Sequence, residues 1–232
     1  SNFSSTNVFI LPAVRAGRLE LITDAMVREV TVDAAGRATG VSYIDKSDGT
    51  DKRIDARIVI LAASACESAR ILLNSTSSRF PQGLANSSGV VGRYLTDTTG
   101  VSVSGFIPAM ADHIPHDEVA VGGAHIYMPW WQDNRKLDFP RGYHIEVYGG
   151  LGAPGAGFMG GIHRYPGGGG YGASLKQAYR KYYGTTIGFS GRGEMVPNDR
   201  SFCEIDPEVK DRWGIPVLRF HWEWSDYEYN QV

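Results

Sequence analysis

Hydrophobic and polar residues alternate through much of the first sixty positions, a pattern that predicts short β-strands. Apolar positions indicate strands at 19–25, 27–32, 41–44 and 54–61, and turn-forming residues separate them. The pair Asp48-Gly49 between the third and fourth strands is a strong hairpin signal. The last strand is almost continuously apolar, which is typical of a strand buried on both faces of a parallel sheet.

A helix is predicted directly after that strand, over residues 66–74. Ser64 is its expected N-cap, and Glu67 three residues later completes the sequence pattern of a capping box. Alanines on both sides of Ser64 keep the turn narrow. In open α/β sheets ligands bind beyond the carboxyl ends of strands, and helix N-termini favour anionic groups. The turn at 62–65 is therefore either a place where part of a nucleotide cofactor approaches the backbone, or a plain corner of strand–helix packing.

The second half of the chain is predicted to be rich in β-structure. Strands are expected near residues 101–107, 119–128, 142–149, 185–196 and 216–222. An amphipathic surface helix is expected at 174–183. Most of the aromatic residues here are expected in the core of an antiparallel sheet, and a sugar-stacking wall is the alternative: Tyr127, Trp130, Trp131, Tyr143, Tyr148, Trp213, Trp222 and Trp224.

A glycine-rich insert at 149–172 interrupts these strands. Gly150, Gly152 and Gly155 have the spacing of a dinucleotide-binding motif, but that motif functions only where a strand leads into a helix. Pro154 and the glycines after it do not permit a helix there. A loop or lid is therefore expected.

Composition narrows the functional classes. The chain has 232 residues, a net charge of −2 and 42% hydrophobic residues, enough for one large or two modest domains. Its charge argues against nucleic acid as a partner, and no apolar run approaches the ~18–20 residues of a membrane span. The two cysteines lack metal-ligand spacing, and His113 and His116 lack a nearby third ligand, so no metal site is expected.

The two ends of the chain suggest a segment of a longer polypeptide. The sequence begins at Ser1 without a methionine. Ser225 and Glu228 form a second capping-box pattern, which opens a helix four residues before the chain stops. Residues 223–232 are therefore expected to be the start of a truncated helix.

Three stretches carry a family resemblance: "GRLELITDAMVREVTVDAAGRATGVSYID", "ARIVILAASACESARILLNS" and "GLANSSGVVGRYLTD". They resemble the middle segment of glucose–methanol–choline (GMC) oxidoreductases, flavoproteins that oxidise an alcohol carbon. The sequences of these stretches are most similar to those of the large flavoprotein subunits of gluconate- and fructose-type dehydrogenases. The resemblance is close over residues 8–107 and continues more weakly to 222. The chain departs from the family's motifs at Ala69, Thr76, Ser78 and Thr98.

The resemblance implies an α/β (α+β) fold and FAD as cofactor. Residues 1–105 would be the middle part of a Rossmann-like FAD-binding domain, and 106–222 a β-rich substrate-binding domain with an antiparallel sheet. Val27 would contact the adenine of FAD through its main chain. Three further residues would line the adenosine and pyrophosphate side, namely Ala62, Ala63 and Ser64.

The family's Gly-x-Gly-x-x-Gly motif and its catalytic histidine would lie outside these 232 residues, so no catalytic residue is expected in the chain. The implied partners are an alcohol or sugar substrate and an electron-acceptor subunit. Two other hypotheses stay open: a non-enzymatic carbohydrate-binding β module, and a degenerate family member with a structural role.

Overall fold

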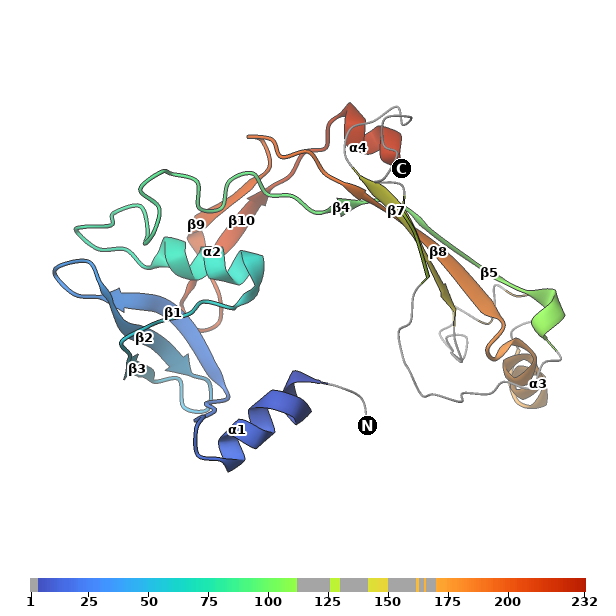
Figure 1. Ribbon diagram of the computed structural model, residues 1–232, viewed down its shortest axis with the longest axis horizontal. Coiled ribbons are helices and arrows are strands. Elements are labelled where there is room, and N and C mark those ends of the chain that lie inside the picture. The colour runs from blue at the N-terminus through green and yellow to red at the C-terminus, as the bar shows by residue number, and fades with distance from the viewer. Residues whose placement is uncertain (1–3, 112–125, 130–141, 150–161, 163–164, 166–169) are drawn as a thin grey trace. The chain divides into compact units, whose positions relative to one another are not determined.

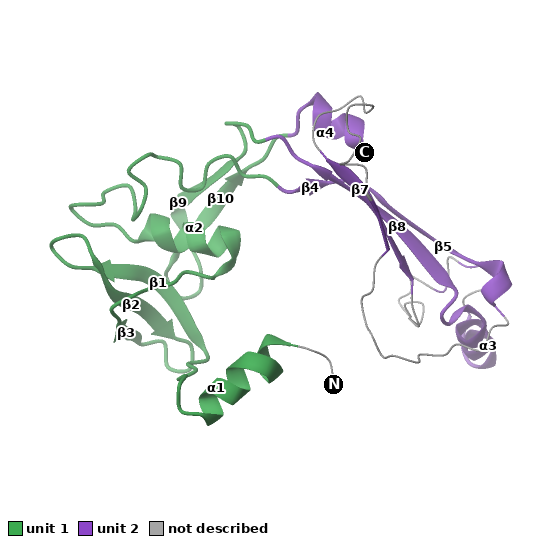
Figure 2. Cartoon of the chain, viewed as in Figure 1, with its two compact units in different colours: residues 1–96, 197–223 green, residues 97–196, 224–232 purple. Residues whose placement is uncertain are grey.

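The computed structural model describes residues 4–111, 126–129, 142–149, 162, 165 and 170–232. The chain divides into two compact units, shown in Figure 2. Unit 1 contains residues 1–96 and 197–223, and unit 2 contains residues 97–196 and 224–232. Each unit thus combines segments that are distant in sequence. The predicted division into functional domains at residue 105 stays a prediction.

Unit 1 consists of a three-stranded sheet, a two-stranded hairpin and helix α2 (Figure 1). Its elements are a short π-helical turn at Thr6–Ile10, α1 at Leu11–Arg15, β1 at Ala25–Val32, β2 at Ala38–Asp45, β3 at Asp51–Asp55, α2 at Ser64–Asn74, β9 at Phe202–Lys210 and β10 at Pro216–His221.

Strands β1, β2 and β3 form an antiparallel meander, which confirms the predicted strands at 27–32 and 41–44 and the hairpin turn at Asp48-Gly49. Val30, Tyr43 and Ile44 are buried in it, and because Tyr43 and Ile44 are consecutive residues, both faces of β2 are covered at that point. The ladder between β1 and β2 is irregular after Val27, where one extra β1 residue interrupts the register.

Two predicted strands are wrong. Residues 19–24 lie outside any strand, and β1 begins only at Ala25. The expected buried strand at 54–61 ends instead at Asp55, and Ile58 and Ile60 are 77% and 83% exposed. All strand pairs in the described part of the chain are antiparallel. Ala56 still donates its N–H to the Thr39 carbonyl of β2, but residues 57–61 pair with no strand there. An apolar run becomes a buried strand only where neighbouring strands and covering layers exist.

The predicted helix at 66–74 is confirmed, but its predicted start is wrong. Helix α2 begins at Ser64, which has a positive φ of 68°, and its N-cap is Ala63. No side chain caps this helix, so Ser64 and Glu67 form no capping box. Glu67 instead contacts Arg70 one turn later, at 3.4 Å.

Unit 2 is an antiparallel five-stranded sheet with two helices. Strand β8 is central: it pairs with β4, β5 and β7, and β6 pairs with β7. Its elements are β4 at Thr98–Thr99, β5 at Ser102–Phe106, a 3-10 turn at Pro108–Met110, β6 at Ile126–Pro129, β7 at Tyr143–Gly149, α3 at Ala173–Tyr182, β8 at Thr186–Glu194 and α4 at Asp226–Gln231.

These elements confirm the expected strands near 101–107, 142–149, 185–196 and 216–222 and the helix at 174–183. Of the strand expected at 119–128, only β6 is described. Several other residues singled out from the sequence lie outside the described residues: His113, His116, Trp130, Trp131 and the Gly150–Gly155 motif.

The prediction that most of the named aromatic residues lie in a sheet core is wrong for those that are described: Tyr127 and Trp222 are exposed, and the other four are half-buried, namely Tyr143, Tyr148, Trp213 and Trp224. Tyr182 of α3 is buried with Ile162 and contacts Phe106 edge to face. Tyr143 and Tyr148 lie over two glycines of β8, Gly191 and Gly188 respectively, where no side chain intervenes.

Candidate functional site

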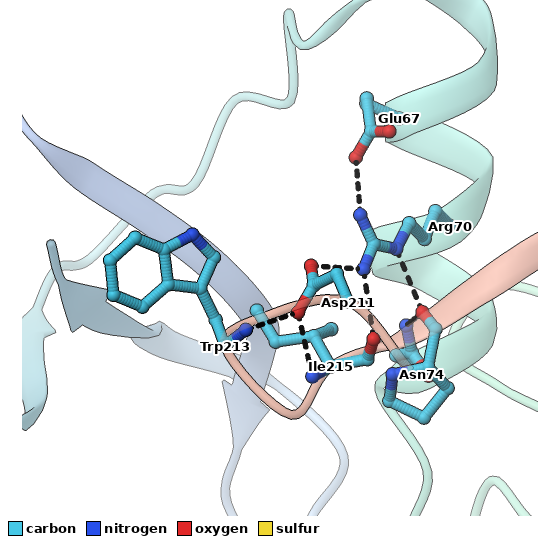
Figure 3. Close-up of polar contacts among 7 residues, drawn as sticks. Glu67, Arg70, Asn74, Asp211, Trp213 and Ile215 are labelled. Carbon is cyan, nitrogen blue, oxygen red and sulfur yellow. Dashed lines mark hydrogen bonds and ion pairs between the residues drawn. The ribbon is translucent and has the colours of Figure 1, made fainter. Parts of the chain in front are cut away.

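Arg70 holds helix α2 against the β9–β10 hairpin. Its side chain is only 10% exposed, and its Nη2 donates to the Asp211 carboxylate at 2.7 Å and to the Ile215 carbonyl at 3.1 Å. Its Nε donates to the Pro216 carbonyl at 2.8 Å, and Asn74 donates to the same oxygen. Figure 3 shows that the Arg70 guanidinium lies between helix α2 and the turn that joins β9 to β10. A buried, paired arginine of this kind fixes the position of the helix.

Asp211 is the acceptor at the centre of this network. One of its oxygens takes the Arg70 bond, and the other accepts the backbone N–H groups of Trp213 and Ile215 at 2.8 and 3.0 Å. Burial by itself raises the pKa of Asp211, but the bonds from Arg70 and the two amides outweigh it and hold that pKa below its ordinary value. The carboxylate therefore stays charged at neutral pH.

The other end of α2 is bonded to strand β1. Ser75, directly after the helix, donates through its hydroxyl to the Ile71 carbonyl at 2.6 Å and accepts the Val30 N–H at 2.9 Å. The Val30 N–H therefore bonds to a side chain and not to a neighbouring strand. Strand β1 lies at the edge of its sheet, where main-chain groups can bond to such partners. Val27, predicted to contact adenine through its main chain, is a half-buried residue of this same strand.

A pocket of about 260 Å³ lies beside the first turns of α2. One wall belongs to the helix, another to the segment 92–96, and β9 contributes the last residue. The residues that line it are Ala65, Cys66, Ala69, Gly92, Arg93, Tyr94, Leu95, Thr96 and Cys203. The pocket therefore joins two of the sequence stretches that carry the family resemblance.

Segment 92–96 is bonded along β9. The Gly92 carbonyl accepts the Cys203 N–H at 2.7 Å, and the Leu95 N–H donates to the Ser201 carbonyl at 2.8 Å. Gly92 has a φ of +82°, and a Cβ there would collide with the Cys203 carbonyl oxygen. Only glycine suits this position, because both its φ and the close approach exclude a side chain.

The pocket offers a site of small side chains beside positive charge. Ala65, Ala69 and Gly92 leave space, and the Arg93 guanidinium lies 4.2 Å from the centre of the Phe202 ring. The first turn of α2 has backbone N–H groups that no side chain caps. Uncapped helix donors and an arginine suit an anionic group such as a phosphate.

The four residues predicted to contact FAD do not line the pocket. Ala62 and Ala63 precede α2, Ser64 is its first residue, and Val27 lies on β1. Ala62 and Ser64 are exposed, and Ala63 and Val27 are half-buried. Their roles stay predictions. Sequence reasoning missed Arg93 as a pocket residue, although the motif "VGRYLTD" contains it.

Unit 2 has a second group of functional side chains on one face of its sheet. Alternation places His144 and Glu146 on the same face of β7, and the register sets His144 opposite Arg192 and Glu146 opposite Tyr127. His144 Nε2 lies 3.2 Å from Glu146 Oε1, and Arg192 Nε lies 3.7 Å from Glu146 Oε2. The Tyr127 ring lies 5.5 Å from the His144 ring. This face combines an acceptor, two donors and an aromatic surface.

Other polar groups have structural partners. The larger groove of about 720 Å³ on the β1–β2–β3 meander contains Asp33, Arg37, Arg53 and Asp55, which form ion pairs with one another. His221 Nε2 lies 3.1 Å from Glu204 Oε1 on the neighbouring strand. Among the described residues no group of three or more His, Cys, Asp or Glu could hold a metal ion.

Residues 1–99 match the family model of GMC oxidoreductases. Over these residues the chain is similar to the GMC oxidoreductase family. The match covers the β1–β2–β3 meander, helix α2 and the 92–96 segment, and it confirms the resemblance stated from the sequence. GMC oxidoreductases are in general FAD-dependent, and the mixed α/β architecture of the chain is consistent with their FAD-binding domain.

Curated relatives are similar to nearly the whole chain. A 2-methyl-1,2-propanediol dehydrogenase of Mycolicibacterium austroafricanum is 29% identical over 91% of this chain and 37% of its own length. The fructose dehydrogenase large subunit of Gluconobacter japonicus is 26% identical over 94% of this chain and 38% of its own. The gluconate 2-dehydrogenase flavoprotein of Pantoea cypripedii is 27% identical over 96% of this chain and 36% of its own length.

The chain thus spans between a third and two fifths of the length of these relatives. Within its described part, no helix is both long and apolar enough to cross a membrane.

Proposed function

We propose that this chain is a segment of an FAD-dependent oxidoreductase that oxidises an alcohol or sugar hydroxyl. The observation that carries the proposal is the pocket beside α2, which joins two resemblance motifs of the GMC region and combines small side chains, uncapped helix donors and Arg93. The names of the relatives, dehydrogenases of a diol, fructose and gluconate, supply the substrate class.

The residues of unit 1 have the chemistry that FAD binding requires. The β1 edge offers main-chain groups for the adenine at Val27, and the narrow turn of Ala62, Ala63 and Ser64 would hold the adenosine and pyrophosphate side. Arg93 and the first turn of α2 would stabilise the negative charge of the phosphates. FAD, when bound, would supply the acceptor for a hydride from the alcohol carbon.

The polar face of unit 2 is proposed to bind substrate hydroxyl groups. Glu146 would accept a hydrogen bond from a hydroxyl, His144 and Arg192 would hold the orientation of Glu146, and Tyr127 would offer its ring to an apolar face of a sugar. No catalytic residue is assigned to this chain, and an electron-acceptor subunit is proposed as the partner of the whole protein.

FAD binding is tested by enlarging the turn. In the full-length protein Ala62→Leu should weaken FAD binding by about tenfold, since overpacking at a close contact costs ~1–3 kcal/mol. Flavin released on heating, measured per mole of protein, reports this change. Ala34→Leu, at another exposed alanine in a turn of the same unit, is the matched control and should keep its flavin. Equal flavin in both variants would contradict the proposed contact.

Substrate binding is tested separately at Glu146. Glu146→Gln should raise the KM for the alcohol or sugar by about tenfold, the cost of a charged hydrogen bond, with flavin content unchanged. Glu208→Gln, at an exposed position on β9, is its control. A wild-type KM in Glu146→Gln would remove this face from the substrate site. A full-length protein that contains no flavin and binds sugars would instead support the non-enzymatic carbohydrate-binding module.

A further inference from the structure

The pocket beside α2 brings together the only two cysteines of the chain. Cys66 lies in the first turn of the helix and Cys203 on β9, and both line the pocket as free thiols. They are separated by more than half of the sequence. Their meeting in one cavity is a property of the fold that cysteine spacing does not show.

Contacts along α2 explain why Cys66 faces Cys203. Residues four apart lie on one helix face, so Cys66, Arg70 and Asn74 form a single stripe. Arg70 and Asn74 bond to the Pro216 carbonyl of the β9–β10 hairpin, and Cys66 therefore points toward the same hairpin.

On the hairpin side, Cys203 pairs with Phe220 of β10 and donates its N–H to Gly92. Its Sγ lies 3.3 Å from the place where a Cβ of Gly92 would be, so glycine leaves the sulfur uncovered on that side. The other pocket residues that α2 contributes beside Cys66, Ala65 and Ala69, are also small. No bulky side chain from these positions separates the two thiols.

The two thiols differ in accessibility. Cys66 is partly exposed, whereas Cys203 is only 4% exposed. Burial, and to a lesser degree the neighbouring Cys66, raise the pKa of Cys203. A reagent in solution therefore meets Cys66 first, and the raised pKa keeps Cys203 mostly protonated at neutral pH.

We propose that Cys66 and Cys203 are a redox-active pair that forms a reversible disulfide across the pocket on reaction with a low-molecular-weight disulfide. Cys66 Sγ attacks one sulfur of that reagent, which forms a mixed disulfide and releases one small thiol. Cys203 Sγ then attacks Cys66 Sγ, the bond to the small thiol breaks, and the second small thiol leaves. Two electrons pass to the reagent, and the two cysteine protons end on the two released thiols.

The disulfide would close the pocket. A disulfide brings two Cβ atoms to within about 4 Å, so its formation draws the first turn of α2 toward β9. The bond itself is independent of the proposed function. Its consequence, reduced access of FAD to this pocket, rests on the proposed function.

Mass spectrometry of the intact, full-length protein tests the pair. After wild-type protein is treated with oxidised glutathione, its peptide map should contain one peptide pair joined through Cys66 and Cys203, lighter by two hydrogen atoms than the two reduced peptides together, with no glutathione on either peptide. Cys203→Ser should instead retain one glutathione on Cys66, because the resolving thiol is gone. Wild-type protein oxidised in denaturant should also accumulate mixed disulfides, because the pocket is then absent.

The wild-type peptide map decides the question even if Cys203→Ser does not fold. Native wild-type protein that keeps glutathione on Cys66, stays fully reduced, or joins two copies through Cys66 would overturn the proposal. Flavin content measured on the same samples separates the two proposals: a disulfide with unchanged flavin upholds the cysteine pair and places the cofactor elsewhere.

Discussion

Among the described residues each of the two units buries one charged side chain, and these two side chains are held in different ways. In unit 1 the Arg70 guanidinium pairs with the Asp211 carboxylate and two carbonyl groups, all on the β9–β10 side. In unit 2 the Glu228 carboxylate is fully buried and accepts hydrogen bonds from neutral donors: the Ser225 hydroxyl, the Ser225 N–H and the Val196 N–H.

The difference lies in what remains when one partner is removed. Loss of Arg70 leaves Asp211 as a negative charge without its cation in a mostly buried place. Loss of the Glu228 charge leaves only neutral donors, and two of them belong to the Ser225 cap beside it. An ion pair between distant segments is therefore more vulnerable than a buried charge held by its own helix cap.

The largest effect is expected at Arg70. Arg70→Met should lower the free energy of unfolding by about 3–5 kcal/mol, the usual cost of breaking a buried ion pair on one side. Denaturant unfolding of the full chain measures this loss. Arg18→Met, at an exposed arginine after α1, is the matched control and should change little.

A second variant separates the charge from packing. Arg70→Met combined with Asp211→Asn should recover part of the lost stability, since it removes the unpaired carboxylate. If the single variant were no less stable than Arg18→Met, the Arg70 network would not hold α2 in place.

A smaller effect is expected from pH. Hydrogen bonds hold the pKa values of Asp211 and Glu228 below their ordinary values in the folded chain, although burial opposes this. The unfolded chain therefore binds protons more readily as pH falls. The stability that these two carboxylates contribute is complete at neutral pH and is lost from about pH 5 downward. Denaturant unfolding at a series of pH values measures how steeply the free energy of unfolding depends on pH.

Variants at both carboxylates sharpen this comparison. Glu228→Gln and Asp211→Asn should each be less stable at neutral pH and should each reduce the loss of stability on acidification. Exposed carboxyls with lowered pKa values, such as Asp206 and Glu204, should leave a residual slope. Glu20→Gln, at an exposed position, is the control. If the free energy of unfolding fell with pH as steeply in both variants as in the wild type, Asp211 and Glu228 would not be the source of the acid sensitivity.

The site was predictable only where its signals are local. The helix after the small residues at 62–65 was predicted correctly, although neither the expected capping box nor the expected buried strand before it is present, and the family resemblance named Val27, Ala62, Ala63 and Ser64. The wall of the pocket that β9 contributes could not be predicted from the sequence. Cys203 belongs to β9, which the sequence did not predict, because Asp206 and Pro207 within it disfavour strands.

The sequence by itself determined the features that need only neighbouring residues. The Asp48-Gly49 turn, the alternation along β1 and β2, and the Ser225–Glu228 capping box of α4 are of this kind, because their hydrogen bonds close within a few residues. Tertiary structure decided the rest. It left Ile58 and Ile60 exposed, paired Arg70 with Asp211 and brought Cys66 into the same pocket as Cys203. Burial and ion pairing depend on which distant segments meet, and no local pattern encodes that.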